Sequence, residues 1–284
     1  MTVLLEHERS RQADDARTDD GDFHAASLAR YRAVIPVSTI LLLSIAALFA
    51  GTVDAIAGGG GLITVPALLA AGLPPHVVLA TNKGQSTWGS GASCFTFWRA
   101  GRVDRAQAAF AFPLGFVGAV GGASLVLRVS PDALRPIVIA LLVGAAILLA
   151  IKKPTRDSDG TPHRWIAASL ALVIGAYDGF FGPGTGTFLI VGFVALCGRS
   201  MVHASADAKV VNFAANLAAL LLFAQRGLVV WVVALPMAVG QLLGGVIGAN
   251  LAMKGGARVV RIVVLVVSGS LIVKLAVDLL AARS

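Results

Sequence analysis

Two lysines inside apolar stretches of the chain have the chemistry to bind an anion. Lys83, Ser86 and Ser90 stand at positions i, i+3 and i+7, which places them on one face of a helix. An ammonium group beside hydroxyl donors can hold an oxyanion by charge and hydrogen bonds. A lysine in an apolar span is energetically costly, so this face is expected to border a cavity or the protein interior. The second half of the chain repeats the spacing with Lys209, Asn212 and Asn216.

Two aspartates, Asp54 and Asp178, are the acidic partners available to these lysines. Each comes just before a glycine-rich break, where a carboxylate can pair with a lysine, cap free backbone N–H groups, or take up a proton. The lysines have three open roles as well: contact with an anion, a structural ion pair, or snorkelling of the amine to a membrane interface. Lys83 lies only about six residues, or roughly 9 Å, from the start of its apolar block.

Both halves contain a glycine-rich break that no continuous helix tolerates. Residues 58–61 are four glycines, and residues 182–186 read Gly-Pro-Gly-Thr-Gly. Each break precedes an apolar block too short to cross a bilayer, 61–73 and 184–197. Backbone broken at membrane depth must face protein or a wet cavity, and the N-terminus of the next helix carries free N–H groups that suit an anion. The alternative role of these glycines is close helix packing or a tight turn.

No arrangement of residues suggests catalysis or a bound metal. The five histidines are scattered, Cys94 and Cys197 lie in separate apolar stretches, and residues 31–284 contain no glutamate. These residues supply neither metal-ligand spacing nor a base beside a nucleophile. We therefore expect a protein that is not an enzyme and has no cofactor, with two buried free thiols.

The composition places these motifs in a membrane. Hydrophobic residues make up 57% of the 284 residues, charged residues only 13%, and the mean hydropathy is +0.82, whereas soluble domains carry roughly 25% charged residues. The apolar blocks leave room for roughly eight to ten spans of about 20 residues. The 32 glycines suit closely packed helices rather than the strands of a barrel. The expected fold is an all-α polytopic membrane protein.

The apolar blocks fall into two similar halves. An offset of 124 residues places Asp54 on Asp178, and an offset of 126 places Lys83 on Lys209. We predict a disordered acidic tail at 1–30, a first transmembrane repeat at 31–151, a polar linker at 152–163 and a second repeat at 164–284. Each repeat has about five helical segments, with the broken or re-entrant segments near the membrane midplane. The blocks run 33–57, 61–73, 77–98, 108–127 and 134–151, then 164–182, 184–197, 204–225, 228–252 and 258–281.

The net charge of +8 does not indicate binding to nucleic acid. Residues 1–30 contain seven acids and four arginines, so the remaining 254 residues carry 19 Lys and Arg against 8 Asp. Most of these basic residues lie in short loops between apolar blocks, as they do in the cytoplasmic loops of membrane proteins. The charge therefore orients the chain in the membrane, and no nucleic-acid partner is expected.

The loop charges also favour one topology. If the two short blocks re-enter the membrane, the N-terminus, the 99–106 loop, the central linker, Arg226 and Arg283 share one side. Their basic residues identify that side as the cytoplasm, so we expect eight full spans and two re-entrant segments. The alternative is a pair of inverted repeats of five crossing segments, in which the basic residues divide almost evenly between the two sides.

Taken together, the motifs resemble the TauE/SafE sulfite exporter family, the sulfite and organosulfonate permeases. The resemblance covers about residues 40–280 and rests on AGGGGLITVP at 57–66, ATNK at 80–83, DGFFGPGTG at 178–186 and AKVVN at 208–212. One departure is Gly84, where the family more often has an apolar residue. The resemblance implies that the glycine and lysine motifs hold the substrate. The expected substrate-binding residues are Gly59, Gly60, Gly61, Thr81, Asn82, Lys83, Ser86, Gly184, Thr185, Gly186, Lys209, Asn212 and Asn216, with Asp54 and Asp178 as coupling or ion-pair residues.

The resemblance implies a multi-pass permease of the bacterial inner (plasma) membrane for small sulfur-containing or organic anions. We expect a secondary transporter that exports sulfite or organosulfonates by alternating access around a central anion site. The expected partners are a small anion and the lipid bilayer. Protons are a candidate coupling ion, and a homodimer is a candidate assembly. The alternatives are an uptake permease for another anion, an anion channel of the same architecture, and a membrane-embedded assembly factor that transports nothing.

Overall fold

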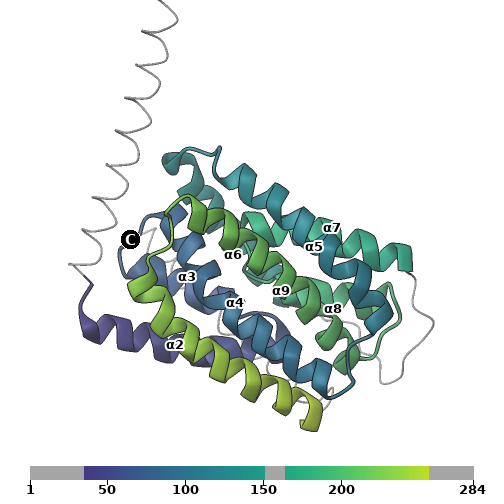
Figure 1. The fold of residues 1–284 in the computed structure, drawn as a ribbon. Helices are drawn as coiled ribbons and strands as arrows, with labels where there is room; N and C mark the ends of the chain where they lie inside the picture. Colours follow the sequence, from purple (N-terminus) through teal and green to yellow (C-terminus); the bar gives the residue numbers. More distant parts are fainter. Residues whose placement is uncertain (1–34, 151–163, 256–284) are drawn as a thin grey trace, which may run out of the picture.

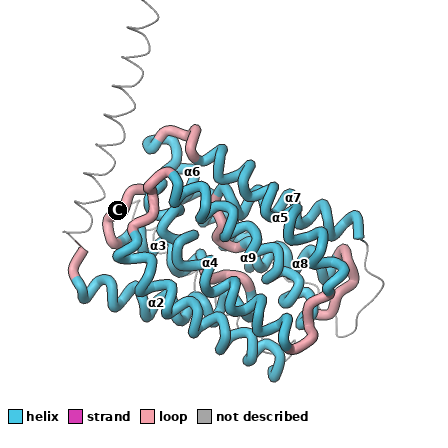
Figure 2. The backbone as a smooth tube through the Cα atoms, in the orientation of Figure 1, coloured by secondary structure: helices cyan, strands magenta, loops and turns pink. Residues whose placement is uncertain are grey.

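The computed structural model describes residues 35–150 and 164–255, and every regular element in these ranges is a helix (Figures 1 and 2). The expected all-helical fold is confirmed. The predicted tail 1–30, the linker 152–163 and the last apolar block 258–281 lie outside the described residues. The helices are α2 (Val37–Ala57), α3 (Gly61–Ala70), α4 (Pro75–Arg99), α5 (Arg105–Val126), α6 (Pro131–Ala150), α7 (Arg164–Phe180), α8 (Thr185–Ala195), α9 (Met201–Gln225) and the unlabelled helix Trp231–Gly255.

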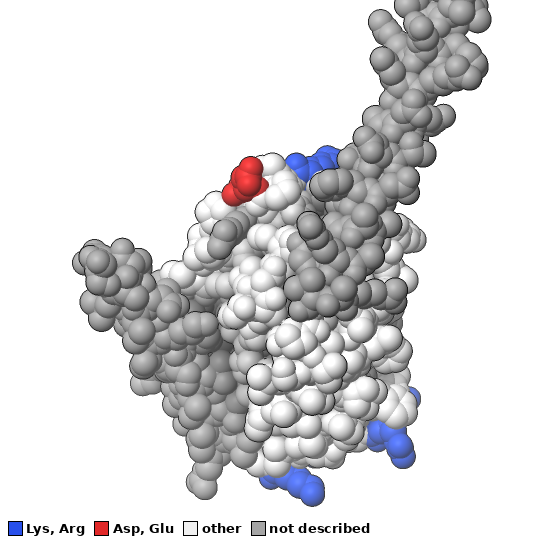
Figure 3. Space-filling view, turned by 90° about the vertical axis from the view of Figure 1, so that its left-hand side faces the viewer, with Lys and Arg blue, Asp and Glu red and all other residues white. Residues whose placement is uncertain are grey.

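The helix lengths and surface are those of a membrane protein. Four helices of the described part are long and apolar enough to cross a bilayer: α2, α5, α9 and Trp231–Gly255. The helices that follow the two glycine breaks, α3 and α8, have only 10 and 11 residues. On the face drawn in Figure 3, uncharged side chains fill most of the described surface, and the visible charged side chains lie at its upper and lower margins.

Glycines allow helices from the two halves to pack in close pairs. A Cβ atom at Gly118 of α5 would lie 2.2 Å from the backbone oxygen of Leu172 in α7. A Cβ at Gly244, in the helix Trp231–Gly255, would lie 2.1 Å from the backbone oxygen of Leu48 in α2. Small residues at such contacts let helix backbones approach in the membrane, where packing replaces the hydrophobic effect as the driving force. Each pair joins one half of the chain to the other, and Figure 1 shows both pairs lying side by side.

The contacts at the helix ends define the direction of each helix. At one end of the bundle, the backbone N–H of Asp104 donates to Asp207 Oδ1 at 3.0 Å, so the loop before α5 lies beside the first turns of α9. At the other end, the N–H of Val230 donates to Thr81 Oγ1 at 3.1 Å, so the segment after α9 lies beside the start of α4. The start of α2 lies at this second end, because α2 runs parallel to Trp231–Gly255.

These directions correct the predicted sidedness of the loops. The start of α2 and Arg226 lie at the opposite end of the bundle from the 99–105 loop, so the arrangement that placed them on one side is wrong. The reason is that α3 turns back at the glycine break and returns to the end where α2 began, so α2 and α3 together do not cross. Among residues 35–150 and 164–255, α7, α8, α9 and Trp231–Gly255 run opposite to α2, α3, α4 and α5, respectively, as the alternative expects, although α3 and α8 are too short to span.

Cysteine labelling tests this order of helices. Ala100→Cys and Gln225→Cys place a thiol at exposed positions at opposite ends of the bundle and leave every charge unchanged. In whole cells, we expect an impermeant maleimide to label only one of the two variants before membranes are opened. The wild-type protein is the control for the two native thiols: Cys197 is buried, as expected, whereas Cys94 is only partly buried. Labelling of both variants from the same side would contradict the helix directions.

Candidate functional site

The two glycine breaks meet near the centre of the bundle. Gly58 ends α2 with a positive φ of 80°, and a Cβ there would lie 2.1 Å from the carbonyl carbon of Gly186. Thr187 Oγ1 donates to the backbone oxygen of Ala57 at 2.6 Å, which fixes the second break against the first. Gly184 begins α8 in the left-handed conformation, with φ 87°. Only glycines allow both this backbone geometry and this approach.

Two lysine–aspartate ion pairs connect the halves crosswise at these breaks. Lys83 Nζ of α4 lies 2.6 Å from Asp178 Oδ1 of α7, and Lys209 Nζ of α9 lies 2.6 Å from Asp54 Oδ2 of α2. The side chains of Lys83, Asp178 and Lys209 are at most 2% exposed, whereas the Asp54 side chain is 18% exposed. Both lysines therefore adopt the ion-pair arrangement, one of the three roles open from the sequence, and neither amine reaches the surface.

Asparagine amides complete the pairing around Asp178. Asn212 Nδ2 donates to Asp178 Oδ2 at 2.9 Å, and Lys83 Nζ also donates to Asn216 Oδ1 at 2.9 Å. Asn216 Nδ2 in turn donates to Ser90 Oγ at 3.2 Å, so the polar faces of α4 and α9 touch. A buried charge that is both paired and hydrogen-bonded costs far less than an isolated one. The polar stripes predicted on the two helices thus face each other rather than lipid.

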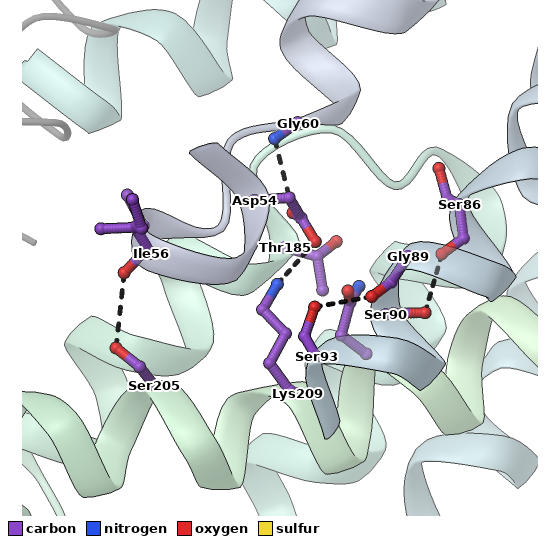
Figure 4. A network of polar contacts seen from close by, with 12 residues as sticks. Asp54, Ile56, Gly60, Ser86, Gly89, Ser90, Ser93, Thr185, Ser205 and Lys209 are labelled. Atoms are coloured by element: carbon purple, nitrogen blue, oxygen red, sulfur yellow. Dashed lines mark hydrogen bonds and ion pairs between the residues drawn. The ribbon is translucent and has the colours of Figure 1, made fainter. Parts of the chain in front are cut away.

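The Asp54 carboxylate links the second ion pair to the first glycine break. Its Oδ1 accepts a 3.4 Å hydrogen bond from the backbone N–H of Gly60, while its Oδ2 accepts from Lys209 (Figure 4). Gly60 precedes α3, so the carboxylate lies at a helix N-terminus, where backbone N–H groups favour negative charge. An anionic group therefore already occupies the position that the sequence analysis assigned to a bound anion.

A small cavity of about 20 Å³ is bordered by Lys83 and by one glycine of each break, Gly61 and Gly182. This volume holds about one water molecule. Eight of the predicted site residues border it: Asp54, Gly61, Asn82, Lys83, Ser86, Asp178, Asn212 and Asn216.

Seven predicted residues do not border the cavity. Thr81 accepts the hydrogen bond from Val230, Thr185 Oγ1 donates to the backbone oxygen of Gly182, and Gly186 packs on Gly58. Gly84, the position where the sequence departs from the family pattern, packs closely on Val229, because a Cβ there would lie 2.9 Å from Val229 Cγ1. The residues of this group are Gly59, Gly60, Thr81, Gly184, Thr185, Gly186 and Lys209.

Two cavity residues, Gly182 and Gln241, are absent from the predicted set. Gly182 belongs to the second glycine break, so its place follows from the motif. Gln241 lies in the helix Trp231–Gly255, and its one signal in the sequence is an amide within an apolar block. Within residues 35–150 and 164–255, no three His, Cys, Asp or Glu side chains lie close enough together to hold a metal ion.

A second polar cluster closes one end of the bundle. Arg199 lies 2.9 Å from Asp207 and 3.5 Å from Asp104, and these two acids are also joined by the hydrogen bond from the Asp104 N–H. The corresponding contact at the other end, between Val230 and Thr81, involves no charged group. The two ends of the bundle are therefore held by contacts of different strength.

A helical membrane protein with ion pairs at two broken helices has the architecture of a membrane transporter, in which the binding site lies where two halves meet. The chain belongs to the TauE/SafE sulfite exporter family, whose model matches residues 43–275. It is 40% identical over 243 residues to the probable membrane transporter protein ORF9 of a Sinorhizobium species, covering 84% of this chain and 93% of the relative.

Two further relatives carry the same kind of name. The probable membrane transporter protein YfcA of Escherichia coli K12 is 39% identical over 256 residues, 87% of this chain and 94% of the relative. A probable membrane transporter protein of Haemophilus influenzae is 33% identical over 247 residues, 86% of this chain and 97% of the relative. No solved structure matches the chain. The predicted family is therefore confirmed.

Proposed function

We propose that this protein is a secondary transporter that exports sulfite or organosulfonates across the bacterial inner membrane. The crossed pairs Lys83–Asp178 and Lys209–Asp54 at the helix breaks carry this proposal. A sulfite or sulfonate group presents oxygen acceptors, as a carboxylate does, so it can replace an aspartate as the partner of a lysine. The description of the family supports sulfite as the first substrate to test.

Recurring contacts support a pair of inverted repeats as the moving parts. The hydrogen-bonded pairs Asp104–Asp207 and Val230–Thr81 are related by the offset of 126 residues that also relates Lys83 to Lys209. Each pair joins the start of one central helix to a loop of the other half, at opposite ends of the bundle. Transporters built from inverted repeats expose a central site alternately to the two sides by moving one repeat against the other.

The described conformation has no room for the substrate. Sulfite has four non-hydrogen atoms, whereas the cavity holds about one water molecule. The breaks must therefore separate, at one end or the other, before an anion can reach the lysines. When the anion replaces a carboxylate, the released Asp54 or Asp178 can accept a proton, which makes protons a candidate coupling ion. An inside-negative potential favours export of an anion by about 2.3 kcal/mol per charge and per 100 mV.

The basic residues support a cytoplasmic location for the end that contains the 99–105 loop. Counted over residues 35–150 and 164–255, the helix directions put more arginine and lysine at this end than at the other, and cytoplasmic ends carry such an excess. At this end lie Arg99, Arg102, Arg105, Arg164, Arg199 and Lys254, and at the other lie Arg128, Arg135 and Arg226.

Transport by the purified protein in proteoliposomes tests the proposed function. Sulfite, sulfate, thiosulfate, sulfoacetate and taurine are compared, with empty liposomes as the control. A carrier gives a saturable rate and exchanges labelled sulfite for unlabelled sulfite across the membrane. Conductance without saturation or exchange would indicate a channel instead. If no anion moves faster than in empty liposomes, the proposed function is wrong and a role without transport is favoured.

A further inference from the structure

Gln241 brings an amide into the central cavity from a helix that the sequence motifs do not include. It lies in Trp231–Gly255, a helix apolar enough to cross a bilayer, and it is 3% exposed. The cavity that it borders is the one lined by Lys83 and Asp178. A buried amide in such a helix faces the protein interior rather than lipid and indicates a functional position.

Two glycines on neighbouring helices make room for this amide. A Cβ atom at Gly51 of α2 would lie 2.5 Å from Gln241 Oε1, and a Cβ at Gly89 of α4 would lie 2.7 Å from the same atom. Any other residue at either position would collide with the amide. The glutamine side chain is thus accommodated by backbone on two sides.

No hydrogen bond joins the amide to another residue within 35–150 or 164–255, and its polar atoms, unlike those of Gln107, are not fully enclosed by protein. The amide therefore adds no hydrogen bond to the stability of the described fold. The four charged groups of the site are different, since each aspartate pairs with a lysine. The amide N–H of Gln241 is therefore a neutral donor at the cavity that neither ion pair uses.

Gln241 also distinguishes one half of the chain from the other. The offset of 126 residues that relates Lys83 to Lys209 relates Gln241 to Gly115. The two positions make equivalent contacts, because Gly115 packs on Gly175 of α7 as Gln241 packs on Gly51 of α2. The lysines and aspartates occur in both halves, but the amide occurs in one. An anion whose two ends differ can be oriented by such a single donor.

We propose that Gln241 donates a hydrogen bond to the transported anion and sets the selectivity among small oxyanions. This inference rests on the proposed transport function. The lysines provide attraction for any anion, and the amide responds to the position of one oxygen atom. A site built to hydrogen-bond a particular group rejects analogues that leave its donor unpaired.

The test compares Gln241→Met, Gln241→Glu and wild-type protein in proteoliposomes with sulfite and sulfoacetate as the two probes. Methionine keeps the unbranched shape but cannot donate, so we expect kcat/KM for the preferred anion to fall by about 10- to 100-fold, the value of a hydrogen bond to a charged group. The ratio of the kcat/KM values for sulfite and sulfoacetate should change by at least about fivefold. Gln241→Glu keeps the shape and adds repulsion, so it should lower the rate for both anions.

Gln107→Met is the matched control. Gln107 is a buried glutamine of α5 whose amide also lacks a partner among the described residues, and it does not border the cavity. The transport rates of Gln107→Met should match those of the wild type. The elution profile and Tm of each variant report whether it is folded. If the wild type transports and Gln241→Met keeps the wild-type ratio of kcat/KM values for the two anions, the role proposed for Gln241 is wrong, but the transport function stands. If the wild type moves no anion, both proposals fall.

Discussion

Lys83→Ala is expected to abolish transport and to destabilise the protein by about 3 to 5 kcal/mol. The substitution leaves Asp178 buried without its cation, and breaking one partner of a buried ion pair has an effect of this size. Thermal unfolding in detergent measures the stability, and sulfite flux in proteoliposomes measures the transport. Lys254→Ala is the control, because Lys254 is exposed at the end of its helix.

A double variant separates binding of the anion from stability. Lys83→Met combined with Asp178→Leu removes both charges and fills the space with apolar atoms, so most of the lost stability should return. Transport should remain absent, because the site has lost a cation that the anion needs. If the double variant transports sulfite at the wild-type rate, Lys83 serves only the fold and the anion site lies elsewhere.

Gly58→Ala is expected to prevent the two helix breaks from meeting. The positive φ of 80° alone costs a residue with a Cβ roughly 1–2 kcal/mol. The added methyl group would also lie 2.1 Å from the carbonyl carbon of Gly186, and overpacking of this kind costs about 1–3 kcal/mol or more. We expect a much lower Tm and a large loss of folded protein on size-exclusion chromatography.

Two other glycines provide controls for the two parts of this effect. Gly72 has a φ of 85° but no atom within 4 Å of a Cβ. Gly72→Ala should therefore be destabilised only by the positive φ and not by a close contact. Gly121 lies in α5 with open space around its Cβ, so Gly121→Ala should be neutral or stabilising by up to about 1 kcal/mol. If Gly58→Ala is no more destabilising than Gly72→Ala, the breaks do not depend on close contact.

If the proposed function holds, the crossed pairs give a physical reason why a neutral site can bind an anion. Two lysines and two aspartates balance one another at the centre of the bundle, so each of these four charges has a partner. An anion that enters must compete with a carboxylate that already belongs to the protein. Exchange of one partner for the other keeps each lysine paired at every stage, which limits the cost of burying charge in a membrane.

The helices and their breaks could be predicted because they depend on consecutive residues. A run of apolar side chains identifies a membrane helix, and the glycines at 58–61 and 182–186 mark where α2 and α7 end. The polar faces of α4 and α9 follow from helical spacing. These properties are local, so the predicted blocks that fall within residues 35–150 and 164–255 agree with the observed helices to within a few residues.

The sequence by itself determined the membrane class, the family, the two glycine breaks and the lysine faces. The tertiary structure decided which aspartate meets which lysine, over separations of 95 and 155 residues, and which end of the bundle each loop occupies. It also brought Gln241 to the cavity. The physical reason is that pairing and direction depend on how the two halves pack, and α3 reverses the chain without crossing, which loop charges cannot reveal.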